Sequence, residues 1–153
     1  MVTDSKHKDA LLTLQKAGIS KTSQRLAVLD ILLKATTPLS VNTIRQSLKT
    51  KASIDKVTVY RILTLFRQRG IIREIASAGG ANYFEMATLE NPLHPHFSCR
   101  NCGAFTCLAP LPFTQAPELI LSKDNYSIDH IEINISGLCA CCRNATNPQK
   151  SMI

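Results

Sequence analysis

The chain has 153 residues, of which 44% are hydrophobic, and a mean hydropathy of +0.01, which fits one ordinary domain or two small ones with a buried core. No apolar run approaches the roughly 18 residues that span a membrane, and the polar N-terminus lacks the apolar segment of a signal peptide. We therefore expect a cytoplasmic protein with no membrane partner, in which paired CxxC motifs more often bind metal than form disulfides.

The formal net charge of +7 is unevenly distributed along the chain. Residues 1–88 hold 14 Lys and Arg against 6 Asp and Glu, whereas residues 89–153 hold 4 against 5 and contain all six cysteines. A basic half without cysteine suggests a polyanionic partner such as nucleic acid. The alternative is a solvated surface that happens to be positive.

The basic half shows the periodicity of four helices, each marked by a capping residue or a closing glycine. They are expected at residues 5–16 before Gly18, from Thr22 to the residues before "TTP", from Ser40, and from Asp55 to Gly70. Two strand-like segments, "IIREIA" and "NYFEM", then flank "SAGGA" and predict a hairpin. Helices followed by a hairpin are the order of a winged helix-turn-helix, whose last helix enters the major groove. Residues 1–86 are therefore predicted to form a DNA-binding domain.

The second half is predicted to be a separate small α/β domain at residues 94–144, joined by a short hinge at residues 87–93, which makes the whole chain α+β. Strand-like pieces occur at "HFSC", "AFTCL" and "SIDHIEINIS", and the last of these places alternate isoleucines on one face. A short helix is expected at residues 118–122, and residues 145–153 are predicted to be a disordered tail.

Two CxxC units, one formed by Cys99 and Cys102 and the other by Cys139 and Cys142, are separated by 36 residues. Two such turns can complete a closed tetrahedral site of four thiolates, which suits structural Zn²⁺. A thioredoxin-like redox pair is an alternative that lacks its βαβ context, and four unligated core cysteines are another. Pairing of Cys139 with Cys141 instead of Cys142 also stays open.

A second site with mixed ligands is suggested by the two histidines that flank a proline. His94 and His96 point to the same side of an extended segment, where both can bind one ion. Glu85, Cys107 and His130 could supply further oxygen, sulfur and nitrogen ligands. The plain alternative is a surface loop with two neighbouring histidines.

These motifs resemble the ferric uptake regulator family of bacterial metal-dependent repressors, and the match covers most of the chain. The segment "KTSQRLAVLDIL" is similar to the family's T-x-x-R-x-x-[IV]-L helix, and "IDKVTVYRILTLFRQRGII" is similar to its T-V-Y-R recognition helix. The segments "YFE", "HPHFSCRNCG" and "DHIEINISGLCACC" follow in the family's order. The combination of TVYR with H-x-H-x-x-C-x-x-C and a distal CxxC is specific.

The resemblance implies an N-terminal winged helix, a C-terminal dimerisation domain, structural zinc at the four CxxC cysteines, and a regulatory metal near the hinge. Glu85, His94 and His96 match the hinge ligands of the family. Cys107 stands where family members usually place an acidic ligand, and His130 matches a histidine of an additional site.

The chain departs from the iron- and peroxide-sensing members, because "TTPLS" lacks the histidine that many of them bring to the hinge site. Pro95 and Leu93 also replace residues that are often acidic or histidine. A thiolate in place of a carboxylate favours Zn²⁺ over Fe²⁺ or Mn²⁺, and "GLCACC" resembles the zinc-sensing branch. We therefore expect a zinc sensor, with an iron sensor, a peroxide sensor or a protein with structural zinc alone as alternatives.

The expected function is transcriptional repression by a homodimer that binds an inverted-repeat DNA operator when its regulatory metal is bound. Phosphate contacts are expected from Lys21, Arg25, Lys56, Arg61 and, in the wing, Arg73, and base contacts from Thr58, Tyr60 and Arg61. A zinc hydrolase or deaminase is not expected, because H-E-x-x-H is absent and neither CxxC follows a proline. A zinc-stabilised interaction module would leave the basic half unexplained.

Overall fold

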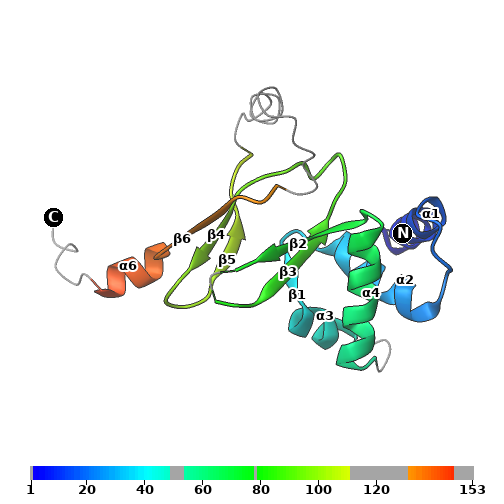
Figure 1. The fold of residues 1–153 in the computed structure, drawn as a ribbon, viewed down its shortest axis with the longest axis horizontal. Helices are drawn as coiled ribbons and strands as arrows, with labels where there is room; N and C mark the ends of the chain where they lie inside the picture. Colours follow the sequence, from blue (N-terminus) through cyan, green and yellow to red (C-terminus); the bar gives the residue numbers. More distant parts are fainter. Residues whose placement is uncertain (1, 49–53, 78, 111–130, 147–153) are drawn as a thin grey trace, which may run out of the picture. The chain divides into compact units, whose positions relative to one another are not determined.

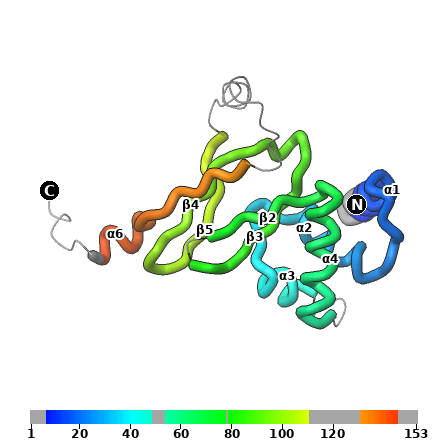
Figure 2. The backbone as a smooth tube through the Cα atoms, in the orientation of Figure 1, coloured from blue at the N-terminus to red at the C-terminus, as the bar shows by residue number. Residues whose placement is uncertain are grey.

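The computed structural model describes residues 2–48, 54–77, 79–110 and 131–146, and Figures 1 and 2 show the ribbon and the backbone path. The chain divides into two compact units, one of residues 1–76 and 81–91 and the other of residues 77–80 and 92–153. The main boundary, after Asn91, falls inside the segment expected to be the hinge. Within the described ranges, no helix has the length and apolar character needed to cross a membrane.

Four helices build the first unit, namely α1 (Val2–Lys16), α2 (Ser23–Lys34), α3 (Val41–Leu48) and α4 (Lys56–Gln68). Three of them begin at the predicted caps, whose side chains accept a backbone N–H three residues later: Thr22 from Arg25, Ser40 from Thr43, and Asp55 from Thr58. These contacts satisfy backbone donors that a helix start leaves without an intrahelical partner. After α1 the chain turns at Gly18, whose φ of +67° favours glycine.

The predicted hairpin is confirmed and forms a three-stranded antiparallel sheet with one further strand. The strands β1 (Leu39–Ser40), β2 (Ile72–Ala76) and β3 (Asn82–Met86) lie in the order β1-β3-β2. Strand β1 was not expected, since its two residues carry no periodicity and their strand character comes from pairing with β3. In the hairpin, Arg73 lies directly opposite Glu85.

The core of the first unit joins the helices to this sheet, and α2, α3 and α4 all contact its strands (Figure 1). Helix α4 contributes the predicted apolar stripe, whose members are all buried: Val59, Ile62, Leu63 and Phe66. The opposite side of α4 is solvent-exposed, with Val57 58% and Tyr60 42% exposed. Helix α4 is thus anchored in the core by one face, and its other face is exposed.

The second unit contains a three-stranded sheet in the order β5-β4-β6, followed by a short helix. Within the described residues, its elements are β4 (His96–Cys99), β5 (Phe105–Cys107), β6 (Asn134–Gly137) and α6 (Ala140–Thr146). Strand β4 pairs antiparallel with β5 and parallel with β6. The central strand is therefore β4, which begins with one predicted metal ligand and ends with another.

The second unit differs from the sequence expectation at two places. The alternating isoleucines predict a strand over residues 127–136, of which the structure describes 131–136; within that part β6 begins only at Asn134, and Ile135 is 42% exposed. Helix α6 was not expected, because its seven residues carry no apolar repeat. It runs to Thr146 and so extends beyond residue 145, where the disordered tail was expected to begin. The helix expected at 118–122, His130 and residues 147–153 lie outside the described residues.

Truncation of a buried α4 side chain tests this packing. Leu63 is 1% exposed. Leu63→Ala should lower the free energy of unfolding by about 2–5 kcal/mol, because it removes buried apolar atoms and leaves a cavity. The matched control Leu89→Ala removes the same atoms from a residue that is 96% exposed and should change stability by less than about 0.5 kcal/mol. Urea unfolding followed by circular dichroism measures both, and equal losses would contradict the assignment of α4's buried face.

Candidate metal centres

The first CxxC occupies a tight turn at the end of β4. Cys99 is the last residue of the strand, and Gly103, with a φ of +73°, lets the chain reverse. The N–H of Gly103 donates to the Cys99 carbonyl at 2.9 Å, and the Cys99 N–H donates to the Ala104 carbonyl at 2.8 Å. These two backbone bonds close the turn and bring Cys102 back towards Cys99.

Parallel strand pairing brings the second CxxC to the same edge of the sheet. Cys99 of β4 is in register with Gly137, the last residue of β6. Because parallel strands end at the same edge, the residues that follow both strands meet there. Cys139 directly precedes α6 and Cys142 lies within it, three residues later, which places both thiols on one side of the helix start.

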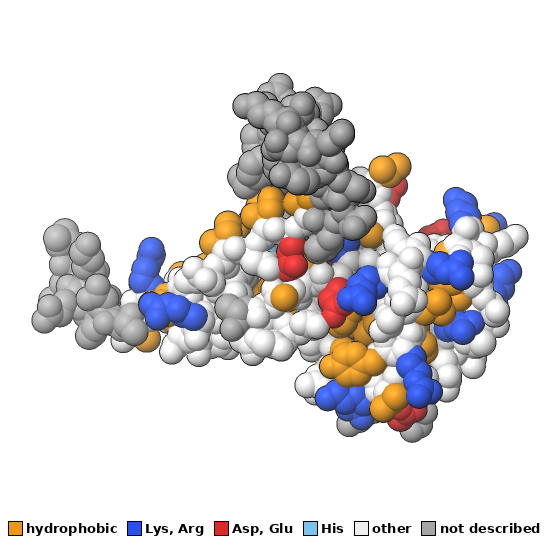
Figure 3. Space-filling model, in the orientation of Figure 1, with side chains coloured by type: hydrophobic (Ala, Val, Ile, Leu, Met, Phe, Trp, Pro, Cys, Tyr) orange, Lys and Arg blue, Asp and Glu red, His pale blue; other side chains and the backbone are white. Residues whose placement is uncertain are grey.

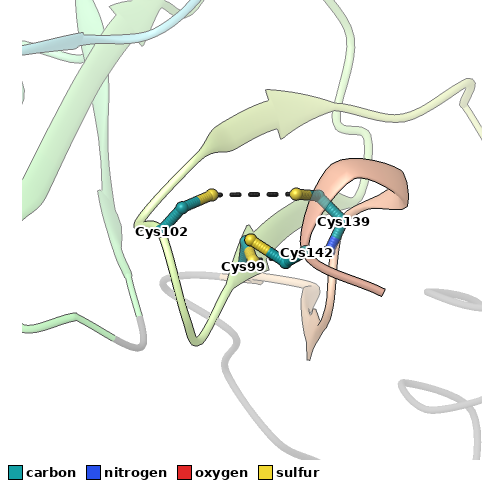
Figure 4. A group of neighbouring side chains, drawn as sticks. All are labelled: Cys99, Cys102, Cys139 and Cys142. Atoms are coloured by element: carbon teal, nitrogen blue, oxygen red, sulfur yellow. Dashed lines mark hydrogen bonds between the residues drawn. The ribbon is translucent and has the colours of Figure 1, made fainter. Parts of the chain in front are cut away.

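The four thiol groups converge, as Figure 4 shows, from the β4 turn and from α6. One sulfur from each of Cys99, Cys102, Cys139 and Cys142 lies within 4.8 Å of the other three, and we call this group the four-thiol cluster. The sulfurs of Cys102 and Cys139 are 3.7 Å apart. None of the six cysteines, all of which the structure describes, forms a disulfide. The exposed Cys141 is not a member of the four-thiol cluster.

Hydrogen bonds and neighbouring sulfurs give the thiols of the four-thiol cluster different acidities. The backbone N–H groups of Cys102 and Cys139 lower the pKa of Cys99 to about 6, because they stabilise its thiolate. A hydrogen bond from Asn101 lowers the pKa of Cys142, but the neighbouring Cys139 and Cys102 sulfurs outweigh it and raise the pKa to about 12. Four thiols so close together cannot all ionise readily without a cation among them.

Asn101 is a member of this site that the motif analysis missed. Its side-chain amide donates to Cys142 Sγ at 3.2 Å, and the Cys139 N–H donates to Cys99 Sγ at 3.3 Å. Donors of this kind orient metal-ligating thiolates and spread their charge. The signal in the sequence was the position of Asn101 between the two cysteines of the first CxxC, but its partner belongs to the other CxxC.

A second group of ligands lies at the opposite end of β4. His96 is its first residue and lies directly across from Cys107 of β5, and His94 precedes it by two residues, so all three can share one face. One ligand atom from each lies within 4.8 Å of the other two. His94 and His96 are buried, 5% and 4% exposed, and their ring centroids are 4.6 Å apart.

The tautomer of His94 follows from its hydrogen bond. Its Nδ1 lies 2.8 Å from the Pro92 carbonyl oxygen, which can only accept, so Nδ1 carries the proton and Nε2 is the nitrogen able to bind a metal. The His96 ring stacks on Phe105, with centroids 5.5 Å apart. Two oriented imidazoles and a thiol form a donor set that suits zinc and other late first-row metals.

The remaining candidates of this site have different surroundings. Glu85, on β3 of the first unit, is 6% exposed and pairs with the guanidinium of Arg73. Arg73, which stays a candidate for a DNA backbone contact from the wing, directs its guanidinium to Glu85 and to the carbonyls of Met86 and Asn91. His130 lies outside the described residues.

The candidate DNA-binding residues gather around α4 and the start of α2. A concave surface is lined by residues of both helices, including the predicted Arg25, Thr58 and Arg61. Figure 3 shows Lys and Arg side chains spread over the visible face of this unit. The Lys56 ammonium lies 5.8 Å from the centre of the Tyr60 ring, and Lys21 is exposed. Cations around a concave helical surface are what a phosphate backbone requires.

The start of α4 refines the set of base-contact candidates. The Thr58 hydroxyl donates to Asp55 at 2.5 Å, so this side chain helps to hold the helix cap. Val57, which the motif analysis did not select, is exposed beside it. An exposed apolar side chain at the start of a recognition helix can contact a thymine methyl group.

Comparisons with known proteins identify the family to which the sequence is similar. The sequence model of the ferric uptake regulator family matches residues 16–136. The peroxide operon regulator of Bacillus subtilis is 27% identical over 141 residues, which cover 92% of this chain and 95% of that protein.

Solved structures show the same fold. The Vibrio cholerae ferric uptake regulator superposes with a TM-score of 0.65 at 27% identity, covering 82% of this chain and 96% of that one. A zinc uptake regulator complexed with zinc and DNA gives a TM-score of 0.64 at 20% identity, covering 95% and 98%. Since the family match extends from the end of α1 to β6, the chain belongs to the ferric uptake regulator family of metal-responsive transcriptional regulators.

Proposed function

We propose that this protein is a cytoplasmic homodimeric repressor that binds an inverted-repeat operator when zinc occupies a regulatory site. The observation that carries the proposal is the presence of two separate ligand sets at the two ends of β4. Cys99 ends the strand within the four-thiol cluster, whereas His96 begins it beside His94 and Cys107. One set suits a structural ion and the other suits a sensed ion.

The four-thiol cluster fits tetrahedral zinc. Four sulfurs placed about 2.3 Å from a tetrahedral ion are about 3.8 Å from one another, and the sulfurs of Cys102 and Cys139 are 3.7 Å apart. A disulfide would require about 2.05 Å. We assign Cys99, Cys102, Cys139 and Cys142 as the ligands of a structural zinc that connects β4 to α6. Such a closed site stabilises the fold and leaves no position for a catalytic water.

Serine replacement of one cysteine tests this assignment. Cys102→Ser should lose the tightly held zinc and lower the melting temperature, since the ion contributes folding free energy. The control Cys141→Ser changes a cysteine that lies inside the second CxxC but outside the four-thiol cluster, and this variant should keep one zinc per chain. Mass spectrometry measures the zinc content of both variants, and thermal unfolding measures their melting temperatures. Loss of zinc in Cys141→Ser with retention in Cys102→Ser would refute the ligand set.

The regulatory site is proposed to contain His94, His96 and Cys107 from the second unit and Glu85 from the first. The thiolate favours Zn²⁺ over Fe²⁺ or Mn²⁺, and His130 is a further candidate ligand. A metal with ligands from both units favours one arrangement of the DNA-binding units in the dimer. Metal and operator must then strengthen each other's binding by the same factor, because the coupling free energy is reciprocal.

Cys107→Ser tests the sensing role separately from folding. The variant should keep its structural zinc and melting temperature but need at least about tenfold more free Zn²⁺ for operator binding, since even outer-shell changes at metal sites cost about 10–100-fold. Fluorescence anisotropy of labelled operator, titrated with buffered Zn²⁺ or Fe²⁺, gives the midpoint. Unfolding of Cys107→Ser would place this cysteine in the structural site. Activation by Fe²⁺ alone, with release by peroxide, would favour the peroxide-sensing alternative.

DNA binding is proposed to use Lys21, Arg25, Lys56, Arg61 and, in the wing, Arg73 for phosphate contacts. Base contacts are proposed for Thr58, Tyr60 and Arg61. Arg61→Ala should weaken binding to specific and random DNA alike and reduce the slope of log affinity against log salt by about 1 per lost phosphate contact. Lys34→Ala, which removes a cation from the other end of α2, is the matched control and should leave the slope unchanged. Binding that does not respond to salt would contradict the nucleic-acid interface and reopen the zinc hydrolase or deaminase alternative.

A further inference from the structure

The buried carboxylate of Glu85 already has a cationic partner within its own unit. Arg73 lies directly across the hairpin from Glu85, and its Nε and Nη2 atoms both lie 2.9 Å from the same carboxylate oxygen, Oε1. The two side chains are 19% and 6% exposed. The pair is therefore largely removed from water. Away from water, two opposite charges attract each other more strongly than at the protein surface.

The Arg73 guanidinium is held in place by more than Glu85. Its Nη2 donates to the Asn91 carbonyl at 2.5 Å and to the Met86 carbonyl at 3.4 Å. The side-chain amide of Asn91 also donates to the Met86 carbonyl, at 2.8 Å. These carbonyls would keep the cation beside Glu85 even when the carboxylate interacts with another group.

A divalent ion bound by Glu85 would thus meet a fixed positive charge. A carboxylate that ligates a metal donates electron density to it, whereas Glu85 Oε1 already accepts a hydrogen bond from Arg73 Nε and lies 2.9 Å from the charged Nη2. The positively charged guanidinium would repel an ion bound at the same carboxylate, in surroundings where little water screens the two charges. The metal must weaken or displace the ion pair in order to bind.

We propose that Arg73 competes with the regulatory metal for Glu85 and so sets the free metal concentration at which the site fills. This inference rests on the proposed function, because it takes Glu85 to be a ligand. Arg73 also contacts Asn91, the last residue of the first unit before the main boundary.

The sign of the effect distinguishes competition from simple support. If Arg73 merely oriented Glu85 as a ligand, its removal would weaken metal binding by about 10–100-fold, as for other outer-shell partners. If Arg73 competes with the metal, its removal should instead strengthen metal binding. Coupling energies between contacting charged residues correspond to roughly 2- to 150-fold, so Arg73→Gln should bind the second metal about tenfold more tightly.

The test measures Zn²⁺ affinity by competition with a chromophoric chelator, on full-length protein already loaded with its structural zinc and without DNA. Arg73→Gln should bind the second Zn²⁺ more tightly than the wild type, and Arg73→Lys, which keeps the charge, should remain close to the wild type. Thermal unfolding and retention of the structural zinc report the fold. Should Arg73→Gln lose that zinc, Arg73→Met, which keeps the apolar stem, takes its place. Equal or weaker binding by the neutral variant overturns the competition.

Glu85→Gln separates this inference from the proposed site. If Glu85→Gln binds the second Zn²⁺ as the wild type does, Glu85 is not a ligand, and both the proposed ligand set and the competition fail. If Glu85→Gln binds weakly while Arg73→Gln shows no gain, the ligand set stands and only the competition is refuted. Weak Zn²⁺ binding by Glu85→Gln together with tighter Zn²⁺ binding by Arg73→Gln supports both the ligand set and the competition.

Discussion

Parallel pairing between β4 and β6 is the constraint on which the second unit depends. The register of Cys99 with Gly137 brings two chain segments that are far apart in sequence to one edge of a small sheet. Parallel strands need a long connection, whose closure costs entropy, and two four-residue strands offset little of that cost. An ion bound by four thiolates at that edge would stabilise the pairing directly.

The same strand separates two sets of candidate metal ligands that are adjacent in sequence. The fourteen residues of "HPHFSCRNCGAFTC" appear as one cluster of soft ligands, yet β4 is long enough to separate them. At one end His96 lies across from Cys107, and at the other end Cys99 enters the four-thiol cluster. A structural ion at one end can hold the strand so that the ligands at the other end are already oriented, which lowers the entropic cost of binding a sensed ion.

Local chemistry in the sequence was sufficient for the helix starts and for the four thiols. Asp55 caps α4 through a neighbour three residues away, and a CxxC spacing restricts both cysteines to one turn. Features set by strand register were not predictable in this way. The ion pair of Arg73 with Glu85, for example, is determined by the pairing of β2 with β3. Asn101 likewise reaches Cys142 only because two distant segments meet.

The central claim is that β4 carries a four-thiolate structural ion at one end and a separate mixed site at the other. X-ray absorption at the zinc K edge, on protein purified with one zinc per chain, tests it most directly. The account predicts a first shell of four sulfurs at about 2.3 Å with no nitrogen or oxygen neighbour. A shell that mixes sulfur with nitrogen at about 2.0–2.1 Å would contradict it, because the tightly held zinc would then involve His94 or His96.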